Sequence, residues 1–504
     1  MDILNKEKYE YLSNKRVTGK TSIIYDLLLP ILLFGSMGAI TWGIRGSAGW
    51  GGVDGTVLPG LMWGVLWYYL AYRNGLDGRG VVLWLGLGIA IGGELGYWQY
   101  VSWIRGILQT GESTKIEPWL GYLWFTLCGI GWAAPGGIIL GWVLGRNVSS
   151  KQWILRSIMI VPLLLILFAW PFIDWLSEYL LLINSSVLFP NIEYGLLISE
   201  LDSYQGQTLY TNTQTISVIV WWVINLFFEA FQKDKTTLIT GLIIGGGFGI
   251  GFLQSALWCY GYGIAPNYID WWKVWELNAG FNLGLLYAVT FYWSVKSKDK
   301  MYNSSKSSKN VVLQNFPEWY KTLFLAIGGS ILIFFTAFEY FFWIGIAIII
   351  FYFSSMLLTT IGSLDSNNID DRRKNFLLYF SIFFLLFLMF FDGSYSMGVI
   401  LELYSAKEVL QYDWPLERYL LFVPLSLILI SVTIFKLRQI LFVNKNNDCA
   451  KLHSGRIVDL MTVMGFIGAV SIWPGKVGVL YALFIIIAIF AFNKIENKFS
   501  NTNG

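Results

Sequence analysis

The sequence predicts an all-α integral membrane protein. The chain is 55% hydrophobic and 18% aromatic but only 13% charged, and its mean hydropathy is +0.56. A soluble globular protein carries about 25% charged residues, so this chain has too few charges to cover a surface exposed to water. Within a bilayer the backbone must satisfy its own hydrogen bonds, and a helix does so inside one segment. The predicted elements are therefore transmembrane helices.

Hydrophobic segments predict the number and limits of these helices. We identify about fourteen segments of roughly 16 to 27 residues, which is near or above the length that crosses a bilayer core. The segments occupy residues 24–44, 56–72, 80–104, 119–145, 153–174, 214–231, 237–261, 271–294, 319–338, 341–362, 376–391, 418–435, 457–473 and 477–493.

The distribution of basic residues predicts the topology. Residues 1–22 are charged and lack the apolar core of a cleavable signal peptide, so they are interpreted as a cytoplasmic tail. With this end inside, the termini and inner loops hold 28 of the 35 Lys and Arg residues. The positive-inside rule then places both termini in the cytoplasm of a multi-pass protein of the cell (inner) membrane. The predicted outer side holds only Arg45, Arg105, Lys115, Lys273, Lys407, Arg418 and Lys476.

Composition divides the chain into four parts. Residues 23–296 form a predicted eight-helix unit, because 40 of the 52 glycines and 21 of the 25 tryptophans precede residue 296. A polar linker is predicted over 297–317, and a six-helix bundle over 318–504. Together with the tail 1–22, these are the predicted units. The alternative is two lipid-facing bundles that differ only in their packing.

A Gly/Trp-rich helical hairpin is predicted to recur within the eight-helix unit. Repeats built from interrupted hydrophobic segments are typical of transport proteins. The alternative is that the glycines only let helix backbones approach closely. The first pattern is Gly86, Gly92, Gly96, Gln99 and Trp103, and at a constant offset of 155 it becomes Gly241, Gly247, Gly251, Gln254 and Trp258. The helices that follow contain Pro135-Gly136-Gly137 and Asn278-Ala279-Gly280, and a weaker third relative surrounds Gly35 and Gly38.

Glu94 is the most informative polar residue within a predicted span. It lies near the middle of 80–104, in Gly92-Gly93-Glu94-Leu95-Gly96. A carboxylate at this depth costs about 2.5–3.5 kcal/mol, so it either binds a proton or substrate or forms a structural ion pair. Arg45 is a candidate partner that could also bind a carboxylate, phosphate or sulfate. The alternative for Arg45 is an arginine that extends to the membrane interface.

Amides and one further carboxylate extend the candidate binding site. Amides suit the hydroxyls of a ligand, and they also suit hydrogen bonds between helices. Asn278 and Asn282 are four residues apart, hence on one helical face. We predict a polar cavity open to the outer side and formed by Arg45, Asp54, Glu94, Gln99, Gln254, Glu276, Asn278 and Asn282.

Aromatic residues, Trp258 and Trp272 among them, crowd the same outer side. They are typical of an interfacial aromatic belt. They would equally bind a saccharide, a lipid-linked saccharide or a quaternary cation.

Several chemistries are not supported by the sequence. The single histidine, His453, lies in a predicted cytoplasmic loop, and the three cysteines do not form a convincing pair. No phosphate-binding loop of the Gly-x-x-x-x-Gly-Lys-Ser/Thr type occurs. We therefore assign no catalytic residue, metal or cofactor, and expect no nucleic-acid partner.

Three functions follow as hypotheses. The first is a transporter or flippase-like permease for a polar or amphipathic, possibly saccharide-bearing, substrate, with the helix repeats enclosing the site. The second is a membrane-embedded glycosyl or acyl transferase that uses a lipid-linked donor, with Glu94, Asp54 or Glu276 as general base. The third is a non-catalytic membrane subunit that binds a partner helix or a second copy of itself. In each case membrane lipid surrounds the chain.

Overall fold

A computed structural model describes residues 23–47, 53–73, 81–96, 98–108, 114–144, 150–183, 187–192, 197–305 and 476–501. Every secondary-structure element named in these ranges is a helix, and one isolated antiparallel bridge joins Ile107 to Lys115. The all-helical prediction is therefore confirmed for the described residues. The five spans predicted between 319 and 473 lie outside them, as do the tail 1–22 and most of the linker.

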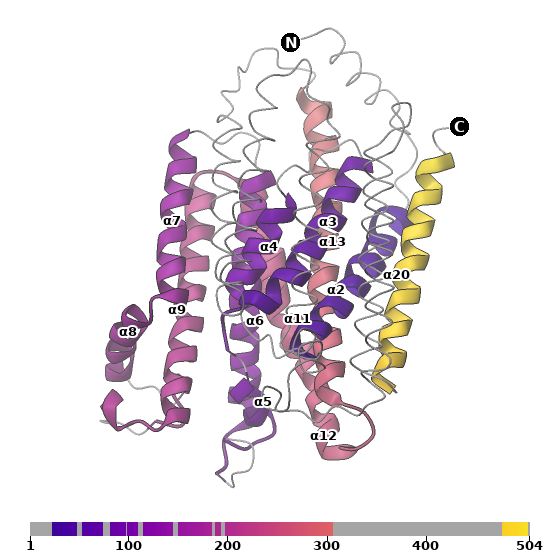
Figure 1. The fold of residues 1–504 in the computed structure, drawn as a ribbon. Helices are drawn as coiled ribbons and strands as arrows, with labels where there is room; N and C mark the ends of the chain where they lie inside the picture. The colour runs from indigo at the N-terminus through magenta and orange to yellow at the C-terminus, as the bar shows by residue number, and fades with distance from the viewer. Residues whose placement is uncertain are drawn as a thin grey trace, which may run out of the picture.

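The helices form an elongated bundle (Figure 1). Their limits are η1 Ile24–Leu28, α2 Leu29–Ser47, α3 Val53–Arg73, α4 Val81–Gly92, α5 Trp98–Ile104, α6 Pro118–Leu144, α7 Ser150–Phe168, α8 Trp170–Ile183, η2 Ile198–Glu200, α9 Ser203–Phe231, α10 Lys235–Gly241, η3 Leu242–Gly246, α11 Gly247–Ala256, η4 Leu257–Tyr260, α12 Gly261–Ile264, α13 Trp271–Ser305 and α20 Lys476–Asn501.

Five helical stretches of the described residues are long and apolar enough to cross a membrane. The bent pair Lys151–Leu167 and Trp170–Leu182 makes a sixth if it is counted as one span. The chain is thus a multi-pass membrane protein by the length and composition of its helices. The five stretches are Ile24–Gly43, Pro118–Leu144, Ser203–Phe231, Lys235–Ile264 and Lys476–Lys498.

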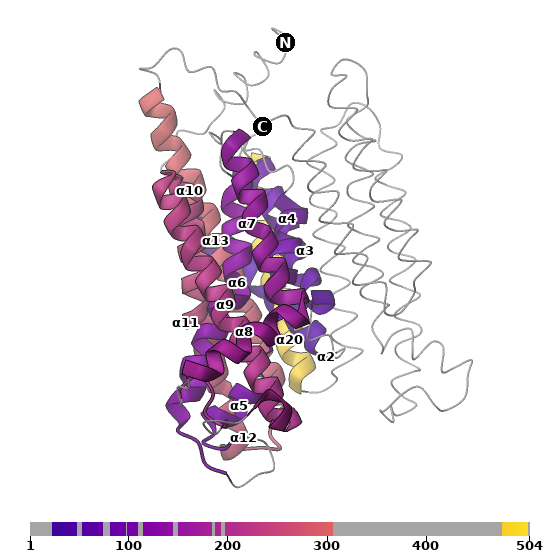
Figure 2. The ribbon, with the colours of Figure 1, turned by 90° about the vertical axis from the view of Figure 1, so that its left-hand side faces the viewer.

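The two ends of the bundle can be told apart. Lys498 forms an ion pair with Asp26 at 2.8 Å, so α20 ends where the first helix begins. We call this end the terminal side, and the end that carries α5 and α12 the loop side (Figure 1). Figure 2 shows α7 and α9 along one flank of the bundle, with α8 turned across it.

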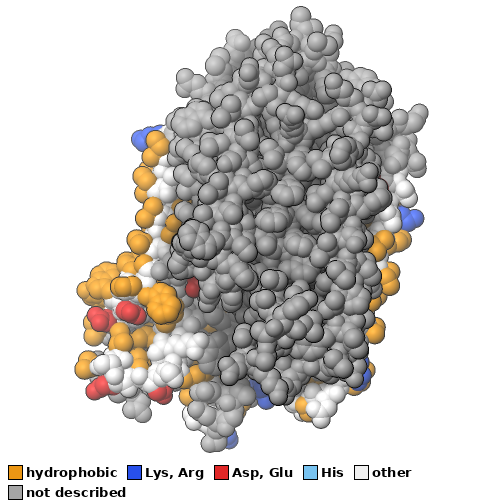
Figure 3. All heavy atoms as spheres, viewed as in Figure 1, with side chains coloured by type: hydrophobic (Ala, Val, Ile, Leu, Met, Phe, Trp, Pro, Cys, Tyr) orange, Lys and Arg blue, Asp and Glu red, His pale blue; other side chains and the backbone are white. Residues whose placement is uncertain are grey.

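Hydrophobic side chains cover the flank formed by α7. Ile154, Ile158, Val161 and Leu165 are exposed there, at the spacing of one helical face. Figure 3 shows this apolar edge, with acidic side chains gathered toward the loop side. A surface of this kind suits contact with lipid acyl chains.

Two predicted spans are interrupted. The span predicted over 80–104 divides into α4, a turn at 93–96, and α5. Two consecutive glycines, Gly92 and Gly93, weaken the helix at this point. The span predicted over 153–174 divides at Ala169, and α8 leaves α7 at 79°. Pro171 lacks the backbone N–H that a continuous helix would use there.

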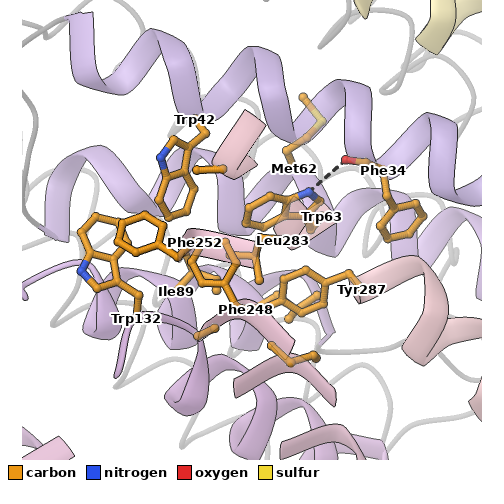
Figure 4. Close-up of a cluster of buried hydrophobic side chains, with 14 of the residues drawn as sticks. Phe34, Trp42, Met62, Trp63, Ile89, Trp132, Phe248, Phe252, Leu283 and Tyr287 are labelled. Atoms are coloured by element: carbon orange, nitrogen blue, oxygen red, sulfur yellow. Dashed lines mark hydrogen bonds between the residues drawn. The ribbon is translucent and has the colours of Figure 1, made fainter. Parts of the chain in front are cut away.

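Aromatic rings fill the centre of the bundle (Figure 4). Trp42 of α2 lies 5.0 Å from Trp132 of α6 between ring centroids, and Trp132 stacks on Phe252 of α11 at 5.9 Å. Trp63 of α3 packs against Tyr287 of α13 at 5.2 Å. These contacts bring five helices together around one core and position the polar groups described below.

Glycines allow close helix crossings around this core. A Cβ atom on Gly38 of α2 would overlap the Gly280 carbonyl oxygen of α13, and one on Gly284 would overlap the Phe34 carbonyl oxygen. Close backbone approach, one of the two interpretations of the glycine pattern, is therefore the role of these three positions. The recurrence of the hairpin remains a prediction.

Candidate functional site

The interruption after α4 contains Glu94. Gly93 N donates the last α-helical hydrogen bond, to Ile89 O at 2.9 Å. Within the break, Leu95 N donates to Gly92 O at 3.2 Å, three residues back. Gly92 fits only without a side chain, because a Cβ atom there would overlap the Trp132 carbonyl oxygen of α6. Glu94 is partly exposed at this break.

Side chains of neighbouring helices satisfy the backbone carbonyls around the break. Trp132 Nε1 donates to Leu95 O at 2.8 Å, and Cys128 Sγ lies 3.6 Å from Gly96 O. Thr56 Oγ1 of α3 donates to Ala90 O at 3.4 Å. Non-helical backbone at membrane depth is tolerated where protein groups replace the lost hydrogen bonds. The break is therefore supported by the packing of α3 and α6.

Helix α9 forms the other wall of the break. A Cβ atom on Gly96 would lie 3.1 Å from Thr211, so the turn packs directly on α9. The preceding residue, Tyr210, interacts electrostatically with both Glu94 and Asp174. Its hydroxyl accepts a hydrogen bond from Gln214 Nε2 at 3.1 Å. Tyr210 of α9 thus interacts with one carboxylate in the break, Glu94, and one on α8, Asp174.

The sequence analysis missed the polar face of α9. It placed residues up to 213 in an outer loop, whereas the helix begins at Ser203. Asp202 caps it by accepting from Gln205 N at 2.7 Å, and this Asp-x-x-Gln capping box was the sequence signal for a helix start here. The polar residues buried in its first half are Thr208, Thr211, Asn212, Thr213, Gln214, Thr215 and Ser217.

Two of these polar residues connect α9 to its neighbours. Tyr100 Oη donates to Asn212 Oδ1 at 2.7 Å, and Ser177 Oγ donates to Thr213 Oγ1 at 3.0 Å. Helices α5, α8 and α9 are thereby held around the break by hydrogen bonds.

A second group of predicted residues meets between α11 and α13. Asn282 Nδ2 donates to Gln254 Oε1 at 2.7 Å and to Gly251 O at 2.8 Å. Nearer the loop side, Trp258 Nε1 donates to Asn278 Oδ1 at 3.0 Å. We call Gln254, Trp258, Asn278 and Asn282 the amide face. Gln254 and Trp258 are exposed, and both asparagines are partly exposed.

Glu276 lies beside the amide face, but its carboxylate is held by neighbouring side chains. It forms an ion pair with Lys273, and the side chains are 0% and 3% exposed respectively. Trp272 Nε1 donates to its other oxygen at 2.9 Å. A buried pair of this kind holds both charges in place, which makes Glu276 a structural residue of α13. Lys273 was counted in the sequence only as an outer basic residue.

The predicted cavity residues thus form two groups. Glu94 packs with α9, whereas the amide face lies on α11 and α13. Helix α6 contacts both, since Trp132 supports the break and Ile130 packs against Gly249 of α11. The remaining predicted residues, Arg45, Asp54 and Gln99, belong to α2, α3 and α5, and their side chains lie outside the described part of the structure.

A buried ion pair connects four helices toward the terminal side. Arg156 of α7 donates through Nε and Nη2 to the two oxygens of Glu229 of α9, at 2.8 Å each. Trp142 Nε1 of α6 also donates to Glu229, and Asp234 before α10 lies 2.5 Å from Arg156. Glu229 and Arg156 are 73 residues apart in the sequence, so only the packing of α7 on α9 brings them together.

Comparisons with protein families, curated proteins and solved structures found no match for this chain. Among the described residues, no three His, Cys, Asp or Glu side chains are grouped so as to hold a metal ion. The function is therefore argued from the chemistry of the break and the amide face. Carboxylate, phenol, hydroxyl and amide groups can bind polar solutes and can exchange protons.

Proposed function

We propose that this protein is a transporter or flippase-like permease for a polar or amphipathic substrate, and that Glu94 binds the substrate or a coupling proton. The observation that carries the proposal is the interruption, at a glutamate, of a segment that the sequence predicts to cross the membrane. Discontinuous helices whose unwound backbone lines a site recur in secondary transporters.

The position of Glu94 along the helix supports this proposal. It is thirteen residues beyond Val81, where α4 begins. At 1.5 Å per residue this is roughly 20 Å along the helix axis, within a hydrocarbon core of about 30 Å. Ionisable groups at such depth are usually functional, because their insertion is costly.

The surroundings of the break suit an uncharged or cationic polar group. Tyr210 interacts electrostatically with Glu94 and with Asp174, and α9 adds hydroxyl and amide groups. Trp170 packs edge-on against Tyr210 at 5.9 Å, which adds an apolar wall. A substrate with hydroxyl groups on an apolar carrier, such as a saccharide-bearing lipid, fits this combination.

The orientation is part of the proposal. We place the terminal side in the cytoplasm of the cell (inner) membrane, because the bias of Lys and Arg toward the termini and alternate loops predicts it. Glu94 and the amide face then approach the outer half of the bilayer.

The transferase alternative would depend on Glu94 or Asp54. Of its candidate bases, Glu276 is buried in an ion pair with Lys273 and is not free to take a proton from a substrate, and the side chain of Asp54 lies outside the described part of the structure. No contact of the described residues favours group transfer over transport, so transport is the function we propose.

Native mass spectrometry of the gently solubilised protein tests the role of Glu94. We expect a retained polar or lipid adduct on the wild-type chain, and its loss from Glu94→Gln. The matched control is Glu178→Gln, which makes the same change at an exposed position of α8. A second assay follows movement of a fluorescent short-chain glycolipid across proteoliposomes, where E94Q should lower the rate at least tenfold. Adduct and rate equal to those of the control variant would refute the proposal.

A further inference from the structure

One exposed stripe of the described helices combines apolar and polar side chains. Leu242, Gly246, Ile250, Gln254 and Leu257 follow one face of η3, α11 and η4, at spacings of three or four residues. Ile250 is 70% exposed, Leu257 is 47% exposed, and Gln254 is exposed between them. We call these five residues the α11 stripe.

The polar part of the stripe lies deep in the membrane. Asn282, which bonds Gln254, is ten residues beyond Trp272 in α13. At 1.5 Å per residue it is about 15 Å from the aromatic end of that helix, near the middle of a core about 30 Å thick. An amide that faces lipid at this depth has no water to bind, so its spare hydrogen-bonding capacity is unfavourable until a partner uses it.

Both amides retain such capacity. The pair uses Asn282 Nδ2 and Gln254 Oε1, and no hydrogen bond of the described structure uses Gln254 Nε2 or Asn282 Oδ1. The same patch therefore offers a spare donor and a spare acceptor at one depth. A surface with both is complementary to itself.

Gly246 adds an independent observation on the same stripe. Among the described residues, a Cβ atom there would meet only Trp222, at 3.8 Å. Neighbouring glycines differ: a Cβ atom on Gly247 would lie 2.8 Å from Leu286, and one on Gly249 would lie 2.6 Å from Ile130. Packing inside the chain therefore does not require glycine at 246, whereas close approach of a helix from outside would.

We infer that the α11 stripe is the contact face of a homodimer. A two-fold axis along the membrane normal keeps equal depths, so Gln254 Nε2 can donate to Asn282 of the partner subunit, and the reverse bond forms by symmetry. Ile250 and Leu257 would pack beside these bonds, and Gly246 would allow the helices to approach. This inference is independent of the role proposed for Glu94.

Cysteine cross-linking in native membranes tests the contact. Cys128 and Cys259 are buried, and Cys449→Ser removes the third cysteine. In this background Ile250→Cys should give a covalent dimer on mild oxidation. Ile158→Cys, on the lipid-facing flank of α7 and 55% exposed, is the matched control and should remain monomeric. Failure of I250C to cross-link, or equal cross-linking of both variants, would overturn the inference.

Two further substitutions test dimerisation without disturbing the fold of the monomer. Gly246→Leu should weaken dimerisation at least tenfold, measured by dilution of fluorescently labelled protein in liposomes. Gly206→Leu is the matched control, because a Cβ atom at Gly206 of α9 would meet no described neighbour within 4 Å, and it should leave the dimer unchanged. Gln254→Leu should weaken the dimer about tenfold, the effect expected of an interhelical hydrogen bond in a membrane.

The outcome also distinguishes other occupants of the stripe. Native mass spectrometry should give a dimer whose abundance falls in G246L but not in E94Q. A monomer that retains a glycolipid or another protein, and loses it in Q254L, would replace the second copy with that partner and overturn the homodimer. Loss of adduct in E94Q with the dimer intact would leave the inference standing, so the two proposals fail separately.

Discussion

The break after α4 and the helix α11 differ although they share one sequence pattern. The shared pattern is Gly92, Gly96, Gln99 and Trp103 in the first and Gly247, Gly251, Gln254 and Trp258 in the second. The chain nevertheless turns at 93–96 in the first and remains helical from Gly247 to Ala256 in the second. Glu94 has Gly249 as its counterpart at the offset of 155. The comparison teaches that glycine permits a break but does not produce one.

The neighbouring helices account for the difference. At the first position Trp132 and Cys128 of α6 supply donors to the carbonyls of residues 95 and 96. At the second position a neighbour supplies one donor, Asn282 Nδ2 to the Gly251 carbonyl at 2.8 Å, while Ile130 packs against Gly249, and the helix keeps its own hydrogen bonds. A membrane helix can be interrupted only where other groups replace the hydrogen bonds of its backbone.

The largest expected difference lies at the equivalent glycines Gly92 and Gly247. Gly92→Ala should destabilise the fold by about 3 kcal/mol, because the new methyl group meets the rigid Trp132 backbone. Gly247→Ala should change stability by less than about 1 kcal/mol, since it meets the movable end of Leu286 and alanine favours helix. Thermal unfolding in detergent measures both, and equal losses would contradict our account of the break.

Replacement of the tryptophans that donate hydrogen bonds should give the second largest difference in stability. Trp132→Phe should cost about 1–3 kcal/mol, because it leaves the buried Leu95 carbonyl without its donor. Trp258→Phe removes a bond to Asn278 at an exposed position, and we expect a loss below about 1 kcal/mol. Denaturant unfolding of the two variants compares them. A W132F variant as stable as W258F would show that the carbonyl finds another partner.

The smallest expected effect is at Gln254. In the detergent-solubilised monomer, Gln254→Ala should change stability by less than about 0.5 kcal/mol, because the residue is exposed. Asn282 keeps its bond to Gly251 O in this variant. The two sites should therefore respond differently: Glu94→Gln is expected to lose the bound ligand, whereas Q254A should change the stability of the monomer little. A large loss of stability in Q254A would assign the amide pair to the fold.

Sequence reasoning recovered the local features of the site. The composition and the long apolar segments predicted membrane helices, and the four-residue spacing placed Asn278 and Asn282 on one face of α13. It also singled out Glu94, and it named Gln254 and Asn282 among the eight residues of one predicted cavity, but not as a hydrogen-bonded pair. The hydropathy and the spacing depend on residues within a few turns of one another.

Sequence reasoning failed where a span contained unusual residues. The polar run 211–215 and the glycines near Glu94 have no regular hydrophobic pattern, so the start of α9 and the turn at 93–96 were missed. In both cases tertiary contacts overrode the hydropathy. Buried hydroxyls and amides of α9 bond to other helices, and Trp132 stabilises the open turn.

The amino-acid sequence alone predicts a helical, apolar chain whose first 296 residues are rich in glycine and tryptophan. Only the tertiary structure decided the partners: Arg156 with Glu229, Trp132 with Leu95, and Gln254 with Asn282. The physical reason is the range of the interactions. Helix formation and hydrophobicity act along the chain, whereas a buried polar group is satisfied by whichever helix packs beside it.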